Sequence, residues 1–173
     1  YVHNTSGGAN ADIGLFANMK EKHNNIRNAV QIGCDVMAIN TYYTFRCGGV
    51  DLRLGFTAPM FLDDLNLLST PINYISYQVC ANEKRKHDVQ IFFGTTPELS
   101  VIKNTQPTIS RIQNVNNIDY IRTGTIEQNV LGKTGDLVSI DWGYLMIPDV
   151  NGKVTMADHN TVVSQFVING TLA

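Results

Sequence analysis

The sequence predicts an all-β fold, an antiparallel β-sandwich of about ten strands with one or two short helical turns. The β-branched residues Thr, Val and Ile make up 46 of the 173 positions, and such side chains fit the pleated surface of a sheet. Glu occurs 4 times and Ala 9 times, so strong helix formers are scarce. The 18 Asn and 14 Gly residues are typical of the turns that connect short strands.

Length and charge favour one folded unit that does not bind nucleic acid. A chain of 173 residues is typical of a single domain, and its net charge of −2 lacks the basic excess that phosphate binding requires. No apolar run approaches the ~18 residues of a membrane helix, so no membrane span is expected. We expect residues 1–30 to be a polar, irregular entry segment with at most one strand, near residues 13–18. Residues 31–173 should form the sandwich domain, as part of a larger multidomain protein.

A β-hairpin gives the clearest local signal. Residues 32–39 and 41–47 are the first two predicted strands, and Gly48-Gly49 follows them. Glycine reaches the positive φ angles that two-residue hairpin turns require. The predicted return strand, residues 50–57, alternates between apolar and polar side chains. Such period-two alternation is typical of a strand with one buried and one solvated face.

Two short helical turns are predicted. Residues 63–68 begin with Asp63 and Asp64, and the helix dipole favours acids at this end. Thr96-Pro97-Glu98 is typical of a cap followed by proline at the first helical position, which predicts a short helix to about Val101.

The remaining strands are predicted from β-branched runs bounded by turn residues. Residues 73–80 and 88–93 are two of them, and we interpret the charged segment 81–87 between them as the solvated tip of a hairpin. Asn-Asn at 116–117, the segment 132–136 and Asn-Gly at 151–152 are predicted turns. The later predicted strands are residues 108–115, 118–127, 137–147, 154–157 and 161–168.

Cysteines and histidines give no sign of a metal site. The three cysteines form no C-x-x-C pair, which argues against a zinc cluster and against a disulfide framework. The favoured interpretation is that they are buried as small hydrophobes, with one oxidised pair left open as an alternative. The four histidines are scattered, and we expect neither a metal nor another cofactor. These residues are Cys34, Cys47, Cys80, His3, His23, His87 and His159.

Four acids are candidates for hydrolytic chemistry, because hydrolases often use paired carboxylates. They are Asp63, Asp64, Asp119 and Asp141. For Asp63 and Asp64 the alternative is a structural acid pair at a helix start. Asp141 lies within an apolar β-like run, where an unpaired carboxylate is costly. A structural salt bridge from Asp141 to Arg122 or Arg53 is favoured over a substrate contact.

An aromatic pair is the other candidate binding feature. Trp142 and Tyr144 are predicted to lie on one face of the same strand, by alternation. An exposed pair of this kind could stack on a sugar ring, whereas burial in the core is the commoner role of such side chains.

Six groups of motifs follow one another between about residues 41 and 147. They are Tyr43-Thr44-Phe45-Arg46-Cys47-Gly48-Gly49-Val50-Asp51-Leu52; Phe56-Thr57-Ala58-Pro59; Asp63-Asp64-Leu65 with Leu68-Ser69-Thr70-Pro71 and Tyr74-Ile75-Ser76; Lys86-His87-Asp88-Val89-Gln90-Ile91; Arg122-Thr123-Gly124-Thr125 with Gln128-Asn129-Val130-Leu131; and Ile140-Asp141-Trp142-Gly143-Tyr144-Leu145. In order and spacing, they resemble the β-rich domain that precedes the helical domain in glutaminase A-type proteins. Cys47 departs from the family pattern, which has a small residue such as Ala there.

The resemblance implies an exported, extracellular or periplasmic protein similar to enzymes that hydrolyse L-glutamine to L-glutamate and ammonia. In that layout a supersandwich-like domain supports a helical toroid that carries most of the active site. We therefore expect this chain to be an accessory domain, inactive alone, whose partners are the helical catalytic domain of the same protein and, in the intact protein, L-glutamine. The matching residues Asp51, Asp63, Asp64, Arg122, Asp141 and Trp142 are pattern matches, and none is assigned as catalytic.

Two alternatives stay open at the level of sequence. The chain could be a carbohydrate-binding sandwich that uses Trp142 and nearby tyrosines, or it could lend an acid such as Asp63 or Asp141 to a composite hydrolase site. The accessory-domain interpretation makes a structural prediction of its own. One sheet face or edge should be unusually apolar, because its partner domain would cover it.

Overall fold

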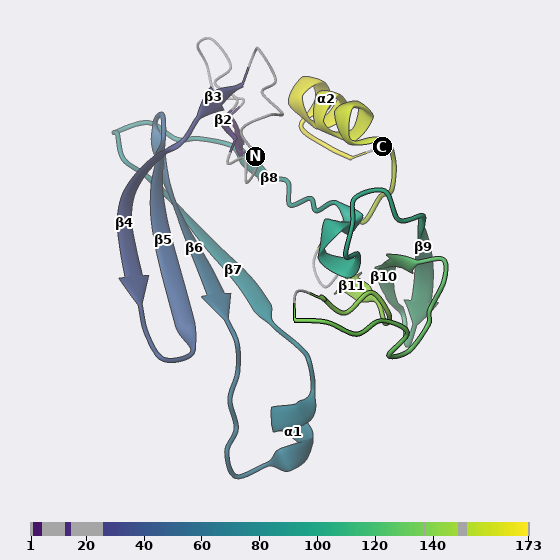
Figure 1. Cartoon of the computed structure of the whole chain (residues 1–173). Coiled ribbons are helices and arrows are strands. Elements are labelled where there is room, and N and C mark those ends of the chain that lie inside the picture. Colours follow the sequence, from purple (N-terminus) through teal and green to yellow (C-terminus); the bar gives the residue numbers. More distant parts are fainter. Residues whose placement is uncertain (1, 5–12, 15–25, 137, 149–151, 173) are drawn as a thin grey trace. The chain divides into compact units, whose positions relative to one another are not determined.

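The computed structural model describes residues 2–4, 13–14, 26–136, 138–148 and 152–172. The predicted all-β, sandwich-like class of fold is confirmed: strands dominate, the two most regular sheets are antiparallel, and the helices are short (Figure 1). The chain divides into two compact units, residues 1–92 and residues 93–173.

The first unit is built on a four-stranded antiparallel sheet whose strands follow one another in chain order. Gly48, with φ of 65°, makes the tight turn between the second and third strands, as the Gly-Gly pair predicts. The helical turn α1 (Leu65–Ser69) lies in the long connection between the third and fourth strands. The strands are β4 (Val30–Val36), β5 (Asn40–Cys47), β6 (Val50–Thr57) and β7 (Tyr74–Ala81).

Alternation gives this sheet one polar and one apolar face. On the polar face, the Arg46 guanidinium donates to both carboxylate oxygens of Asp51 at 3.0 and 3.2 Å, and Arg53 lies over the Tyr42 ring at 4.4 Å. The apolar face is made of side chains that the strand register places side by side. They are Tyr43, Phe45 and Cys47 of β5, Val50, Leu52, Leu54 and Phe56 of β6, and Ile75, Tyr77 and Val79 of β7.

The core of the first unit lies at the hairpin end of the apolar face. Cys47, Val50 and Leu52 are buried there, and Val89 and Ile91 pack against them. The last two residues belong to a second sheet with the order β3-β2-β1-β8, so the layers are sandwich-like at this end. Its strands are β1 (Val2–Asn4), β2 (Ile13–Gly14), β3 (Arg27–Asn28) and β8 (Val89–Ile91), and β2 and β3 are parallel.

Two predictions for the first unit are corrected. The segment 81–87 does not close a hairpin, because β7 pairs with β6 whereas β8 pairs with β1 in the other sheet. The described part of residues 1–30 holds three short strands, where at most one was expected, and β2 ends at Gly14. The remainder of the predicted strand at 15–18 lies outside the described residues.

The cysteine interpretation holds for one residue of three. Cys47 is buried, and this burial raises the pKa of its thiol. Cys34 and Cys80 are exposed, and all three thiols are free rather than paired in a disulfide. Cys34 lies on the edge strand β4 and Cys80 on the polar face of β7, where nothing packs tightly over them.

The second unit holds a three-stranded antiparallel sheet with the order β11-β10-β9. Asn116 and Asn117 turn the chain between β9 and β10 with φ angles of 52° and 63°, the left-handed conformation that asparagine tolerates best among non-glycine residues. The predicted proline-started helix is confirmed as one 3-10 turn, although the Thr96 side chain makes no capping hydrogen bond. The elements are η1 (Pro97–Ser100), β9 (Thr108–Val115), β10 (Ile118–Thr125), β11 (Leu145–Pro148) and α2 (His159–Asn169).

The strand predicted at residues 161–168 is wrong, because this segment is the helix α2. The Asp158 side chain accepts from the backbone N–H of Thr161, which caps the start, and Gly170 ends the helix in a left-handed conformation with φ of 68°. Val162, Val163 and Phe166 are buried, and Phe166 follows the two valines by four and three residues, the spacings that share one helical face. The β-branched run 161–168 therefore forms a helix, and the packing of its buried face stabilises that helix.

Two further strand predictions are corrected. Residues 138–144 are not a strand, and only the end of the predicted segment 137–147 forms β11. Residues 154–157 are irregular, so no hairpin forms around Asn-Gly at 151–152, and residue 151 itself lies outside the described residues.

The capping of α2 can be tested by mutation. Asp158→Ala should lower the free energy of unfolding by about 1 kcal/mol, the usual loss when an N-cap side chain is removed. Asn160→Ala, two residues later and exposed, is the matched control and should leave stability nearly unchanged. Urea unfolding of the three proteins measures both effects. Equal stability of the Asp158 variant and the unchanged chain would contradict the cap.

Candidate functional site

The predicted site residues fall into two groups, one in each unit. Asp63 and Asp64 lie at the start of α1 in the first unit. Arg122 is on β10 of the second unit. The rest of the second group, Asp141, Trp142 and Tyr144, lies in the irregular segment before β11.

The acids before α1 have different surroundings. The Asp64 carboxylate accepts from the backbone N–H groups of Asn66 and Leu67, both at 3.0 Å, so it is an N-cap. Asp63 is exposed and makes no hydrogen bond or ion pair that the described residues supply. The structural interpretation therefore holds for Asp64, while Asp63 presents its charge to solvent.

Asp141 is held in an ion pair, but with a partner that the sequence did not indicate. Its carboxylate lies 2.5 Å from Lys133 Nζ and accepts from the Gln106 side-chain amide at 2.8 Å. The prediction of Arg122 or Arg53 as the partner was wrong, because residue 141 lies in an irregular segment rather than within a strand. The Lys133 hydrogen bond, followed by that of Gln106, holds the pKa of this carboxyl below its usual range.

Polar side chains tie the irregular segments around Asp141 together. Gln106 accepts from the backbone N–H groups of Ile102 and Lys103 at 2.6 and 2.9 Å, so the same side chain links this turn to Asp141. The buried Thr125 hydroxyl lies 2.6 Å from the Asp141 carbonyl oxygen, to which it donates. Gln128 completes the set by accepting from the Gly143 N–H at 2.6 Å and donating to the Thr125 carbonyl at 2.9 Å.

A small polar cavity of about 60 Å³ lies beside this network. Its lining is formed by Gln106, Glu127, Asn129, Gly132, Lys133 and Asp141. A space of this size suits water molecules rather than an amino acid substrate. Since Asp141 is already paired and bonded, its arrangement is that of a structural anchor for the loops rather than of a general base.

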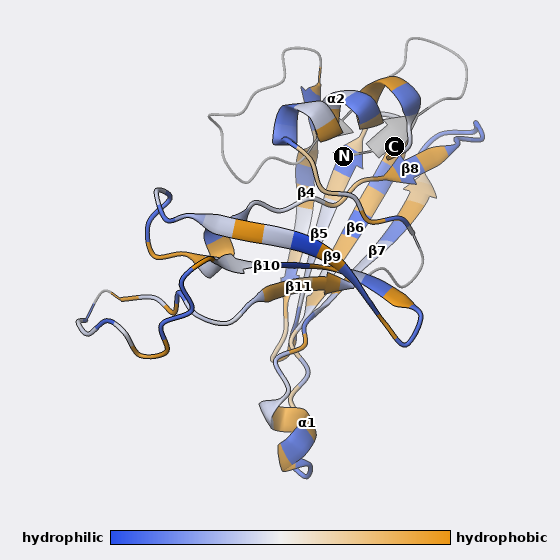
Figure 2. Cartoon of the chain, turned by 90° about the vertical axis from the view of Figure 1, so that its right-hand side faces the viewer, coloured by the Kyte–Doolittle hydropathy of each residue, from blue (hydrophilic) through white to orange (hydrophobic). Residues whose placement is uncertain are grey.

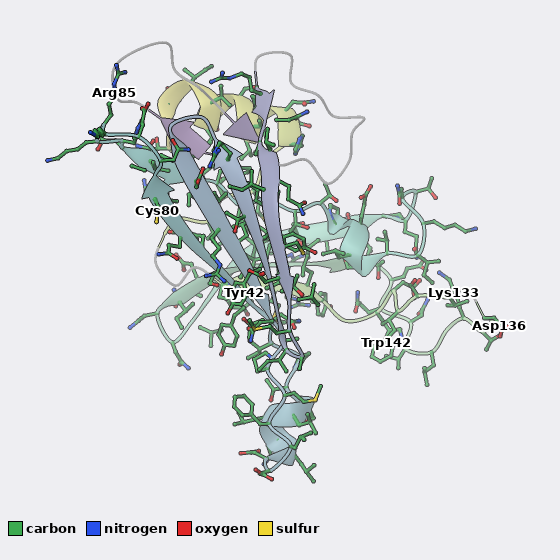
Figure 3. The ribbon with its side chains drawn as sticks, turned by 90° about the vertical axis from the view of Figure 1, so that its left-hand side faces the viewer. Tyr42, Cys80, Arg85, Lys133, Asp136 and Trp142 are labelled. Carbon is green, nitrogen blue, oxygen red and sulfur yellow. The ribbon has the colours of Figure 1, made fainter. Side chains whose placement is uncertain are left out.

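The aromatic pair does not form an open stacking surface. Trp142 and Tyr144 do not share a strand face, because this segment is not a strand. The Arg122 guanidinium lies 3.5 Å from the centroid of the Tyr144 ring and so covers one ring face. Trp142 is half-buried. Figure 3 labels Trp142 together with Lys133 and Asp136, which belong to the same loops of the second unit.

Asp51, another matching residue, also has a structural role. Besides Arg46, the Asn82 amide donates to its carboxylate at 2.8 Å and to the Gly48 carbonyl at 2.9 Å. The bonds from Arg46 and then from Asn82 lower the pKa of Asp51. The residue therefore fastens the hairpin turn to the segment after β7.

Gln106 and Lys133, which help to organise the network, were not singled out in the sequence, and Gln128 was indicated only as part of a motif of the resemblance. A neutral amide such as Gln106 and a loop lysine match no motif. The contacts of Lys133, Gln128 and Gln106 with the segment 141–143 span 8, 15 and 35 residues of the chain. Among the described residues, no group of three or more His, Cys, Asp or Glu side chains is placed to hold a metal ion. No described helix has the length and apolar character needed to span a membrane.

The most unusual surface of the described chain is apolar. Away from the hairpin end, the apolar face of the first sheet is uncovered: Phe56, Ile75 and Tyr77 are 42%, 46% and 63% exposed. The connection from residue 59 to residue 73, here called the arm, adds further exposed apolar side chains. These are Met60, Phe61, Leu62, Leu65, Leu67, Leu68 and Ile72. Figure 2 shows hydrophobic residues along α1, which lies within the arm. The predicted apolar face is thus present, in the first unit.

Local polar bonds, rather than apolar packing, give the arm its structure. Besides the Asp64 cap, the Thr70 hydroxyl donates to the Asn66 carbonyl at 2.6 Å and the Ser69 hydroxyl to the same oxygen at 3.1 Å. Leu65 is 75% exposed and α1 buries none of its residues. The apolar side chains of the arm are therefore available to another surface.

Residues 39–173 match the model of a protein family described as "Domain of unknown function (DUF5127)". This match spans both units and includes every predicted site residue. Neither a curated protein nor a solved structure matches the chain.

The Asp141 anchor makes a pH-dependent prediction. Because its folded-state pKa is depressed, the ionised carboxylate stabilises the fold above the unfolded value of about 3.9, and this stability is lost as pH falls through the folded-state pKa. Asp141→Asn should therefore lose stability relative to the unchanged chain at neutral pH, and the difference should shrink on acidification. Urea unfolding from pH 7 downwards measures it. Lys133→Met removes the main cause of the lowered pKa, so in this background the Asp141→Asn change should alter the pH dependence of stability less. A stability difference between Asp141→Asn and the unchanged chain that does not vary with pH would contradict the interpretation.

Proposed function

The chain belongs to the DUF5127 family, and we propose that it serves as the accessory β-sandwich domain of a glutaminase A-type protein. In this proposal the domain packs against a helical-toroid domain of the same protein, which hydrolyses L-glutamine to L-glutamate and ammonia. The chain supports that domain and holds no complete active site. The intact protein is extracellular or periplasmic.

The uncovered half of the apolar face carries the proposal. A sheet with one apolar face is stable in water when that face packs on another layer, and β8 supplies such a layer only at the hairpin end. Large contiguous apolar surfaces on a folded protein mark sites of interaction. A helical domain is a partner of the right kind, because an amphipathic helix presents its apolar side chains along one face.

The ordered motifs provide independent support. All six groups lie within a span of about 100 residues, and three of them include residues at structural junctions. The first group includes the Gly48-Gly49 turn and Asp51, which fastens it. The fifth and sixth groups include Thr125, Gln128 and Asp141, which join the loops of the second unit. Such residues maintain a scaffold, in keeping with an accessory role.

The two alternatives gain less support from the geometry. A carbohydrate site would need open ring faces, yet Arg122 covers one face of Tyr144 and Trp142 is half-buried. A composite hydrolase site would need an available acid, and Asp141 is paired with Lys133. Asp63 is the candidate acid that projects into solvent, on the arm.

Glutaminase assays test the proposal directly. The intact protein should release ammonia from L-glutamine, whereas the 173-residue chain alone should not. Asp63→Asn in the intact protein should leave turnover unchanged, because the domain only supports the active site. Turnover by the isolated chain, or an intact protein without glutaminase activity, would overturn the proposal. A loss of turnover in Asp63→Asn at unchanged stability would favour the composite site instead.

The packing surface can be tested separately with two variants of β6. Phe56→Ser removes a large side chain from the uncovered apolar face and should weaken binding of the chain to the separately produced helical domain by about tenfold or more. Arg53→Ser changes the polar face of the same strand and should have little effect. Calorimetric titration measures both affinities. Equal weakening by the two variants would show that the apolar face is not the contact.

A further inference from the structure

The two edges of the four-stranded sheet differ in their protection. On β4 the register shifts between Gln31 and Gly33, and the strand carries Asp35, so a bulge and a charge interrupt this edge. β7 pairs with β6 at all eight positions without a shift. It contains no charged residue, no proline and no glycine, and all of its residues except Val79 are exposed. Edges are normally blunted by bulges, charges or proline, and β7 has none of these.

The open β7 edge restricts which kind of partner can bind to it. Its outward N–H and C=O groups need partners, and another extended strand satisfies them in one continuous ladder. Among the described strands, β7 is the last member of its sheet and has no neighbour on the outer side. Eight residues at about 3.4 Å each give a strand of roughly 27 Å, longer than the average strand. The occupant is therefore an extended strand of comparable length with no charge.

Charges lie beyond the two ends of β7, with opposite signs. The arm lies beyond the first end, and its two carboxylates are the only charged side chains between Arg53 and Glu83. The loop beyond the other end, residues 82–88, carries three cations, Lys84, Arg85 and Lys86, against two acids, Glu83 and Asp88, and its three cations are exposed. Figure 1 shows α1 and this loop at opposite ends of the sheet, and Figure 3 shows Arg85 at the tip of the loop.

We propose that β7 pairs antiparallel with β7 of a second copy of this chain, with the acidic arm of each copy beside the basic loop of the other. A twofold axis through the middle of the edge makes identical strands antiparallel. Antiparallel pairing brings the start of one β7 next to the end of the other, so the arm and the loop meet twice. Parallel pairing would bring arm next to arm and loop next to loop, which like charges oppose.

The uncharged strand itself suits this pairing. β7 of the second copy is an extended strand of the required length, and it places no charge opposite a charge. By contrast, pairing through β4 would meet the bulge and bring Asp35 near its own copy. A lipid surface is a poorer occupant, because the arm carries two carboxylates and no cation to meet anionic headgroups. The surface goes beyond the proposed function, since it uses the sheet edge and not the apolar face.

Sedimentation equilibrium of the chain with two matched variants tests the pairing. Gln78→Lys places a charge in the middle of β7 and should raise the dimer dissociation constant by about tenfold or more. Gln31→Lys makes the same change on the exposed opposite edge and should leave the constant unchanged. Hydrogen exchange should show slow outward amides of β7 in the dimer and fast ones in Gln78→Lys. A monomeric chain, or equal effects of the two variants on the dissociation constant, would overturn the proposal. This holds also where another partner covers β7.

A charge exchange tests the antiparallel arrangement. Asp63→Lys places a cation beside the basic loop, and Arg85→Glu places a carboxylate beside the acidic arm, in each case at both ends of the paired edge. Each should therefore weaken the dimer several-fold at low salt. The double variant restores opposite charges and should regain most of the affinity. High salt should reduce all three differences. Additive weakening in the double variant would exclude the contact between arm and loop.

Discussion

The alternation of apolar and polar side chains along β5, β6 and β7 is the constraint on which the rest of the structure depends. One face of the sheet is solvated and carries a salt bridge and a cation–π contact. The other face is apolar, and burying it against another layer stabilises the fold. The second sheet meets this requirement only near the hairpin, where Val89 and Ile91 reach Cys47, Val50 and Leu52. β8 is much shorter than β5, β6 and β7, so it covers only the part of the apolar face near the hairpin. The side chains farther along these strands stay exposed for this reason.

The second unit solves its packing problem in a different way. Its loops are long, and their order comes from side-chain amides and hydroxyls that bond to the backbone of distant segments. Gln106, Gln128 and Thr125 each join parts of the chain that no strand pairing joins. Buried polar groups must be bonded, and here the bonds themselves fix the loop geometry. The Asp141 ion pair is part of the same network, and its role is therefore structural.

Local patterns predicted the strands well and their partners less well. The bounds of β6 and β9 agree with the predictions, because alternation and turn residues are both local signals. The segment 161–168 was misjudged because Val162, Val163 and Phe166 fit a β-branched run and a helical face equally well, and the caps at Asp158 and Gly170 decide between them. The hairpin at 81–87 was misjudged because the choice between β6 and β1 as a partner is made by distant residues. For the candidate site, the type of bond at Asp141 was predicted and its partner was not, since Lys133 lies in a loop whose course depends on the network itself.

The apolar face and the uncharged edge of the same sheet set separate requirements. A face is covered by side chains packing on it, which any layer of suitable shape can provide, whereas an edge is covered only by a strand that supplies backbone donors and acceptors. A helical domain can meet the first requirement and cannot meet the second, because its backbone groups are already bonded within each helix. A second copy of β7 can meet the second requirement and leaves Phe56 and Ile75 uncovered. The two contacts use different groups of the sheet, side chains on its face and backbone groups at its edge, so losing one contact should leave the other in place.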